Sequence, residues 1–332
     1  MTGPQPPASR DHAATRETCH GWSKALMLPP DLYPGVGGKQ FRAELVRGCF
    51  EAAGGTGDAP EAVIDAIEML HAGSLVVDDF EDGSAMRRGQ PSLHRVVGAP
   101  RAVNAGNWMY FRALELAAAA YEAPRPRAEL LERFVTVGRI CHEGQALDLT
   151  ARADRVTASE AASTAYLISK WKTGSLVSLA AWGGVHAACG SDTALRFAST
   201  CGETLGVCLQ MRNDLDELIE FADGSDRGDD LANARVTWPW AWAAGLLSPS
   251  LFRGLQRSLR SAGGDRSRLR KVACGLRDLV VETGTRRLEE RLSRLASRLR
   301  EVAGPECRVE RLLSVAERLR PEPVAAAVGV GE

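Results

Sequence analysis

The chain has 332 residues, a hydrophobic content of 45% and a formal net charge of -1 at pH 7. This length permits one large helical domain or two smaller ones, and the apolar content is enough for a sizeable core. The near-zero net charge gives no global field that would attract nucleic acid. The 8 cysteines are scattered, without a CxxC pair or a secretory signal, which predicts reduced thiols in a cytoplasmic protein. No apolar run has the length and purity of a membrane span.

The first third of the chain predicts a leader followed by helices. Residues 1–21 are rich in Pro, Ala, Thr and charge without periodicity, which predicts a disordered leader. A glycine turn at 33–38 leads into a helix that we expect to end near residue 53. Pro60 is suited to a first helical turn, and apolar residues then repeat at helical spacing up to Asp78. Residues 91–100 are predicted to form a loop.

The rest of the chain also shows helical patterns and no strand or hairpin signal. Gly174 lies inside one predicted helix, where glycine costs stability, and so indicates close packing or a bend. The predicted fold class is all-α, with one helical domain over 22–318 and a flexible tail over 319–332. In helical bundles, ligand sites are built in the core from facing helices. Helices are expected over 104–120, 129–149, 158–181, 194–221 and 267–303, with a polar loop at 224–235.

An acidic cluster followed by a basic pair ends the second predicted helix. Asp78 and Asp82 stand at i and i+4, on one helical face. Burial would raise the pKa of both carboxylates unless a cation lay between them. Oxygen ligands at this spacing suit Mg²⁺, which takes one or two carboxylates and completes its shell with water and phosphate oxygens. Arg87 and Arg88 add the fork geometry that binds phosphate, so the pattern predicts a phosphorylated ligand held through metal.

Simpler interpretations exist for each feature on its own. A short acidic run is usually a solvated helix end, and a lone histidine such as His71, two turns before Asp78, is usually a core residue. Lys39 and Arg42 near a helix start would suit an anion, but a glycine turn before a helix explains them as well. The second oxygen-rich face, Asn213 and Glu217 at i and i+4, favours the metal hypothesis.

Six motifs in chain order resemble the trans-isoprenyl diphosphate synthases, the polyprenyl synthetase family, and look closest to the geranylgeranyl diphosphate synthases. One motif alone would be a weak signal, but six in the family's order are a strong one. The resemblance implies an isoprenoid-synthase-type helical bundle around a central cavity, and a homodimer. The motifs lie at 37–42, 71–89, 104–111, 144–148, 172–174 and 210–217.

The resemblance also implies roles for individual residues. Arg87 and Lys172 would bind the allylic diphosphate, and Thr173 and Gln145 would line the region of the carbocation. Three Mg²⁺ ions per site would be held by Asp78, Asp79, Asp82, Asn213, Asp214 and Glu217. The remaining substrate contacts would come from Lys39, Arg42, His71 and Arg88 on the diphosphate of isopentenyl diphosphate, together with Gln210 and Arg235.

The implied product has about twenty carbons by the same resemblance. Gly73 and Ser74 lie one turn before Asp78, where a bulky aromatic side chain would block the tunnel early. Tyr110, Phe111 and His142 match the tunnel floor of the geranylgeranyl enzymes, although an aromatic stripe is more often core.

Two departures from the family pattern leave alternatives open. Asn213 stands where the family has an acid, and Ala234-Arg235 stands where it has Gly-Lys. An altered second motif would suit transfer to a phosphorylated acceptor such as indole-3-glycerol phosphate. It also resembles the class I terpene cyclases, but Phe221 stands where that motif needs its last acid. A helical scaffold without activity would bind no diphosphate. The retained anion-binding residues favour condensation with isopentenyl diphosphate.

Overall fold

The structure, a computed structural model, describes residues 40–58, 60–302 and 308–321. The predicted leader, the glycine turn with Lys39, and most of the predicted tail lie outside these residues. Of the helices that the structure describes, none is both long and apolar enough to cross a membrane.

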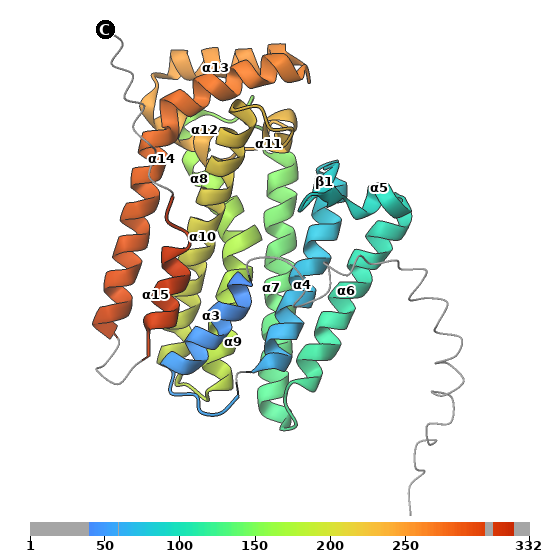
Figure 1. Ribbon diagram of the computed structural model, residues 1–332, viewed down its shortest axis with the longest axis vertical. Helices are drawn as coiled ribbons and strands as arrows, with labels where there is room; N and C mark the ends of the chain where they lie inside the picture. The colour runs from blue at the N-terminus through green and yellow to red at the C-terminus, as the bar shows by residue number, and fades with distance from the viewer. Residues whose placement is uncertain (1–39, 59, 303–307, 322–332) are drawn as a thin grey trace, which may run out of the picture.

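Long helices running along one axis form the body of the molecule (Figure 1). The central helix α9 is buried on nearly every side and packs against α3 and α10. Small residues permit this close packing: a Cβ atom on Gly184 would lie 2.3 Å from the carbonyl oxygen of Val46. The predicted all-α class is therefore confirmed. The helices of the body are α3 (Phe41–Ala52), α4 (Glu61–Glu81), α6 (Ala99–Ala119), α7 (Pro124–Thr150), α8 (Ala158–Ile168), α9 (Ser175–Ala187) and α10 (Asp192–Ala222).

Shorter elements and the C-terminal helices close the bundle. The helix α13 crosses one end of the molecule, and α15 lies beside α14 (Figure 1). Aromatic side chains from this region, Trp240, Trp242 and Phe252, are among the largest fully buried groups. These elements are α5 (Leu93–Val97), α11 (Asp229–Ala232), α12 (Trp238–Leu246), α13 (Pro249–Ala262), α14 (Arg266–Val302) and α15 (Glu310–Glu317).

A π-helical segment, η2 (Ser169–Gly174), interrupts the helix that the sequence predicts over 158–181. Its Gly174 lies against α10 so closely that a Cβ on Gly206 would come within 2.6 Å of the Gly174 Cα atom. Gly174 therefore marks close packing, one of the two meanings expected for it. π-Helical turns inside α-helices are frequent at functional sites, and this one carries Lys172 and Thr173.

A two-stranded hairpin follows α4, where the sequence gives no hairpin signal. The strands β1 (Met86–Arg87) and β2 (Gln90–Pro91) pair in antiparallel fashion. Arg88 and Gly89 form the turn with φ values of 52° and 78°, in the left-handed region that tight hairpin turns require. The expectation of no hairpin was wrong because these strands are too short to show a period of two, and Arg-Gly is a weak turn signal. The predicted loop at 91–100 likewise contains α5.

Candidate active site

A cavity of about 1460 Å³ opens between the helices of the body. At one end its wall is charged, with side chains from the C-terminal end of α4, from η2 and from α10. Farther along α4, α6 and α7 the wall mixes apolar side chains with charged ones such as Asp65, Glu68 and Arg139. Such a cavity can hold a molecule with a charged head and a long apolar tail. The apolar lining includes Phe41, Ile64, Leu70, Leu114, Phe134, Val135 and Leu176.

Asp78 is the centre of the charged end. Its Oδ1 atom lies 2.8 Å from the Nζ atom of Lys172 and accepts a 2.9 Å hydrogen bond from the Gln145 side chain. Burial acts to raise the pKa of Asp78, but the charge and hydrogen bond of Lys172 outweigh it and lower this pKa. Asp78 is therefore held as a carboxylate.

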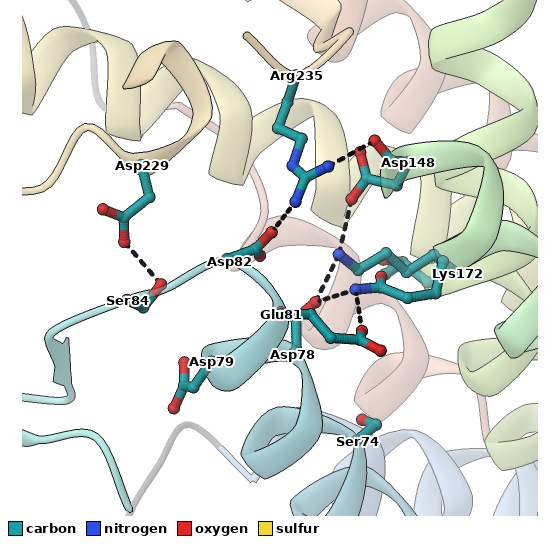
Figure 2. A network of polar contacts seen from close by, with 12 residues as sticks. Ser74, Asp78, Asp79, Glu81, Asp82, Ser84, Asp148, Lys172, Asp229 and Arg235 are labelled. Atoms are coloured by element: carbon teal, nitrogen blue, oxygen red, sulfur yellow. Dashed lines mark hydrogen bonds and ion pairs between the residues drawn. The ribbon is translucent and has the colours of Figure 1, made fainter. Parts of the chain in front are cut away.

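Lys172 lies between two carboxylates from different helices, Asp78 and Asp148 (Figure 2). Its Nζ atom is also 2.8 Å from Oδ2 of Asp148 on α7. Burial acts to lower the pKa of Lys172, but the two carboxylates raise it above its usual value. Asp148 ends the motif at 144–148, and the resemblance assigns it no role. Its position one turn after Gln145 on the same helix places both side chains on the cavity wall.

Asp79 points away from Asp78 and Asp82 (Figure 2). Its Oδ1 atom accepts a 2.8 Å hydrogen bond from Nε of Arg87, and its side chain is buried outside the cavity lining. Burial raises the pKa of Asp79. Asp79 therefore positions Arg87, whose Nη2 atom also lies 4.0 Å from Oδ2 of Asp78.

Asp82 pairs with Arg235, which comes from the segment between α11 and α12 (Figure 2). Arg235 is only 7% exposed, and its Nη1 atom donates a 2.8 Å hydrogen bond to the carbonyl oxygen of Asp148. Burial and the neighbouring Asp78 raise the pKa of Asp82. Arg235 is thus a bridge between α4 and α7, and it contacts the cavity through Asp82, since it is not itself in the lining.

Three side chains link η2 to α10 beside the charged end. The Thr173 hydroxyl donates a 2.7 Å hydrogen bond to Oε1 of Gln210, and Gln210 donates one of the same length to Oδ1 of Asp214. Gln145 donates to Glu81 as well as to Asp78, and its own Oε1 atom is buried without a partner among the described residues. Thr173, Gln145 and Gln210 all line the cavity, as their implied roles require.

The second acidic face offers fewer free oxygens than its sequence implies. Both carboxylate oxygens of Asp214 accept hydrogen bonds, from Gln210 and from the backbone N–H of Trp238. Burial raises the pKa of Asp214 to about 7. Glu217 accepts from the backbone N–H of Asp230 at 3.0 Å through one oxygen. Asn213 is exposed on the cavity lining, so this face presents Asn213 and the second oxygen of Glu217.

Cationic and imidazole groups line another part of the cavity wall. Arg42, His71 and Arg88 lie there together. Burial, followed by the charges of Arg42 and Arg88, lowers the pKa of His71 well below its usual value. Burial also lowers the pKa of Arg42, whose Nε atom has no hydrogen-bond partner among the described residues. This wall is suited to an anion. Lys39, predicted to join it, lies outside the described residues.

The predicted tunnel floor is only partly assembled. Tyr110 and His142 line the cavity and meet edge to face, with ring centroids 5.5 Å apart. Phe111 is 70% exposed and does not line the cavity, because adjacent helical residues point about 100° apart. Ser74 lines the cavity, whereas a Cβ on Gly73 would lie 3.0 Å from the Gly106 carbonyl oxygen of α6. Gly73 therefore permits helix packing.

The fold and the site together define a class of protein, an all-α bundle whose cavity joins an acidic face to an anion-binding wall. The sequence matches the family described as Polyprenyl synthetase over residues 24–273. The chain belongs to this family.

Relatives and solved structures agree with that assignment. A geranylgeranyl pyrophosphate synthase of Penicillium janthinellum is 30% identical over 226 residues, 68% of this chain and 59% of the relative. One of Eremothecium gossypii is 33% identical over 208 residues, 61% of this chain and 64% of the relative. The match thus spans less than two thirds of either relative. A solved geranylgeranyl pyrophosphate synthetase of Pyrococcus horikoshii shares the fold, with a TM-score of 0.73, 23% identity and coverage of 95% and 98% of the two chains.

Proposed function

We propose that the protein is a Mg²⁺-dependent prenyltransferase that condenses an allylic diphosphate with isopentenyl diphosphate to give geranylgeranyl diphosphate. The observation that carries the proposal is a single cavity lined by Asp78 and Asp82, by Arg42 and Arg88, and by apolar side chains such as Leu114, Phe134 and Leu176. The names of the similar proteins support this choice of product.

The donor set at the charged end fits Mg²⁺. Asp78, Glu81 and Asp82 bring carboxylate oxygens to the cavity from one helix end, and Asn213 and Glu217 bring amide and carboxylate oxygens from α10. Oxygen donors supplied by a few carboxylates suit Mg²⁺, which fills its other positions with water and phosphate. Within the described residues, no three histidine, cysteine or acidic side chains lie close enough together to hold a metal ion by themselves. We propose three ions per site, which would neutralise the charge that develops on the departing diphosphate.

The chain's own residues would bind the two diphosphates and protect the allylic cation. Lys172 and Arg87 would bind the allylic diphosphate and stabilise its developing charge. Arg42, His71, Arg88 and Lys39 would hold the diphosphate of the acceptor. The oxygens of Thr173 and Gln145 would face the allylic cation, and the apolar wall would exclude the water that would otherwise capture it. The acceptor's double bond attacks the cation, and the released diphosphate accepts the proton.

A product assay tests the proposal. The enzyme is incubated with Mg²⁺ and farnesyl or geranylgeranyl diphosphate, alone, with isopentenyl diphosphate, or with indole-3-glycerol phosphate. We expect elongation of farnesyl diphosphate only in the tube with isopentenyl diphosphate, and none after chelation of the metal. A prenylated indole would show an acceptor outside the isoprenoids. A hydrocarbon or alcohol formed without acceptor would show a cyclase.

We further propose a cytoplasmic homodimer. Phe111 on α6 is 70% exposed and lies outside the cavity lining, and an exposed aromatic side chain favours burial against a second copy. The cysteines recorded in the described residues are free thiols, which suits the cytoplasm. Light scattering that gives a monomer mass at micromolar concentration would contradict the dimer.

A further inference from the structure

Glycine inside a helix lowers helix stability relative to alanine, so each helical glycine needs a physical reason. Close packing supplies it at several positions in this chain. A Cβ on Gly202 would lie 2.7 Å from the carbonyl oxygen of Val177, and one on Gly144 would lie 2.5 Å from the backbone nitrogen of Lys172. At these positions a side chain has no room.

Close packing does not explain Gly138 on α7. The position of its Cβ atom has no described heavy atom within 4 Å. Gly245 and Gly275 also have open Cβ positions, but they do not line the cavity, whereas Gly138 does. Within residues 40–58, 60–302 and 308–321, Gly138 is the one helical glycine that combines an open Cβ position with a place on the cavity wall.

The position of Gly138 along α7 relates it to the length of a bound chain. Asp148, Gln145, Cys141, Gly138 and Phe134 recur three or four residues apart and all line the cavity. Asp148 belongs to the charged end, and Gly138 lies ten residues before it, roughly 15 Å along the helix axis. The glycine is therefore nearly three helical turns from the end of the cavity that holds Asp148.

The neighbours of Gly138 show that the cavity continues past the Tyr110–His142 contact. His142 lies one turn after Gly138 on the same face of α7. On the other side, Leu114 lies one turn beyond Tyr110 on α6, and Phe134 lies one turn before Gly138; both line the cavity. A side chain at position 138 would project into the wall between the aromatic contact and these apolar side chains.

We propose that Gly138 determines the length of the prenyl product. This assignment rests on the proposed function. The hydrogen side chain at position 138 keeps the channel open beyond Tyr110 and His142, so the growing chain extends to Leu114 and Phe134 before elongation stops. A larger side chain at this position fills the end of the channel and stops elongation earlier.

Two substitutions of graded size test the assignment. Gly138→Ala adds one methyl group where there is space, and alanine favours the helix, so this variant should melt at or above the wild-type temperature. Gly138→Leu should shift the main product from twenty to fifteen carbons, and Gly138→Ala should give a mixture. The control is Gly275→Leu, at an exposed helical glycine of α14 that does not line the cavity, which should leave the products unchanged.

The assay uses purified full-length protein with Mg²⁺, geranyl diphosphate and labelled isopentenyl diphosphate, and separates the dephosphorylated products by chain length. The initial rate of the first condensation should be retained in both Gly138 variants, because the change is remote from the charged end. If the wild type elongates but Gly138→Ala and Gly138→Leu give its product distribution, the assignment of Gly138 is overturned alone. If the wild type transfers nothing to isopentenyl diphosphate, the proposed function fails, and this assignment fails with it.

Discussion

The Nζ atom of Lys172 lies 2.8 Å from the Oδ1 atom of Asp78 and joins η2 to the end of α4 across the cavity. The same ammonium group is 2.8 Å from Asp148 on α7. One cation therefore balances two carboxylates from different helices, and its removal would leave Asp78 with only the more distant Arg87, 4.0 Å away.

A double-mutant cycle on Lys172 and Asp148 measures the coupling free energy of this ion pair. Lys172→Met alone should lower the free energy of unfolding by about 2–3 kcal/mol, less than the loss for a fully buried pair, because these side chains are partly exposed. The double variant with Asp148→Asn should lose less than the sum of the two singles, with a coupling of about 1–2 kcal/mol. Strict additivity in urea titrations would show that the pair contributes nothing.

Ala234 should be replaceable by glycine with a gain in stability. It is buried with a φ of 52°, in the left-handed region that disfavours residues with a Cβ atom. Ala234→Gly should raise the free energy of unfolding by about 0.5–1 kcal/mol, because the relief of strain exceeds the entropy cost of glycine. Ala243→Gly, inside the helix α12, should lower it. A fall in melting temperature for Ala234→Gly would contradict the strain.

His71 should make the protein less stable in mild acid. Its pKa is well below the usual value in the folded state, whereas the unfolded chain takes up a proton near pH 6.5. Below that pH the unfolded state therefore binds more protons, and the free energy of unfolding falls as the pH falls. His71→Gln should lose less stability than the wild type between pH 7 and pH 5. Parallel stability curves for the two proteins would show that His71 titrates normally.

Asp78 and Asp79 should differ in their effect on catalysis although they are neighbours. Asp78→Asn removes a charge from the cavity wall and should lower kcat by about 10²-fold or more. Asp79 lies outside the lining and holds Arg87, so Asp79→Asn should act mainly on the KM for the allylic diphosphate. Steady-state kinetics over a range of Mg²⁺ concentrations distinguish the two. Wild-type turnover by Asp78→Asn would be incompatible with the proposed function.

Substitutions of Tyr110 and of Phe111 should likewise have different effects on the product. Tyr110 lines the cavity against His142, and Phe111 faces outward. Tyr110→Ala should broaden the distribution of product lengths because it widens the channel beside position 138, and Phe111→Ala should leave the product length unchanged. The products are compared by chain length after dephosphorylation. A longer product from Phe111→Ala alone would place its side chain back on the channel.

Much of the site follows from local sequence patterns. The i, i+4 spacing of Asp78 and Asp82 and the helical period around them locate the acidic face, and both side chains do line the cavity. The same periodicity already implies that Asp79 and Phe111 point elsewhere, since successive helical residues differ by about 100°. The role of Asp79 as a metal ligand and of Phe111 in the tunnel floor is implied by the family motifs alone.

Other contacts depend on the tertiary fold and leave no local signal. Arg235 meets Asp82 from 153 residues away, and Asp229 accepts a hydrogen bond from Ser84 across 145 residues. The π-helical turn at η2 also leaves no local signal in the sequence. Its physical basis is the packing of Gly174 against α10, which is a tertiary contact. Such features follow from how distant helix ends meet, which hydrophobic periodicity does not specify.

The ion pairs of the first acidic face have a consequence for how ligands bind. Asp78, Asp79 and Asp82 are paired with Lys172, Arg87 and Arg235 respectively. A divalent ion in the cavity must compete with Lys172 and Arg235 for Asp78 and Asp82, and a diphosphate must compete with Asp78 and Asp79 for Lys172 and Arg87. Each ligand alone therefore breaks ion pairs, whereas the two together offset the charges of Asp78 and Lys172 that each exposes. Metal and diphosphate should then show positive thermodynamic linkage, each raising the affinity for the other by the same factor.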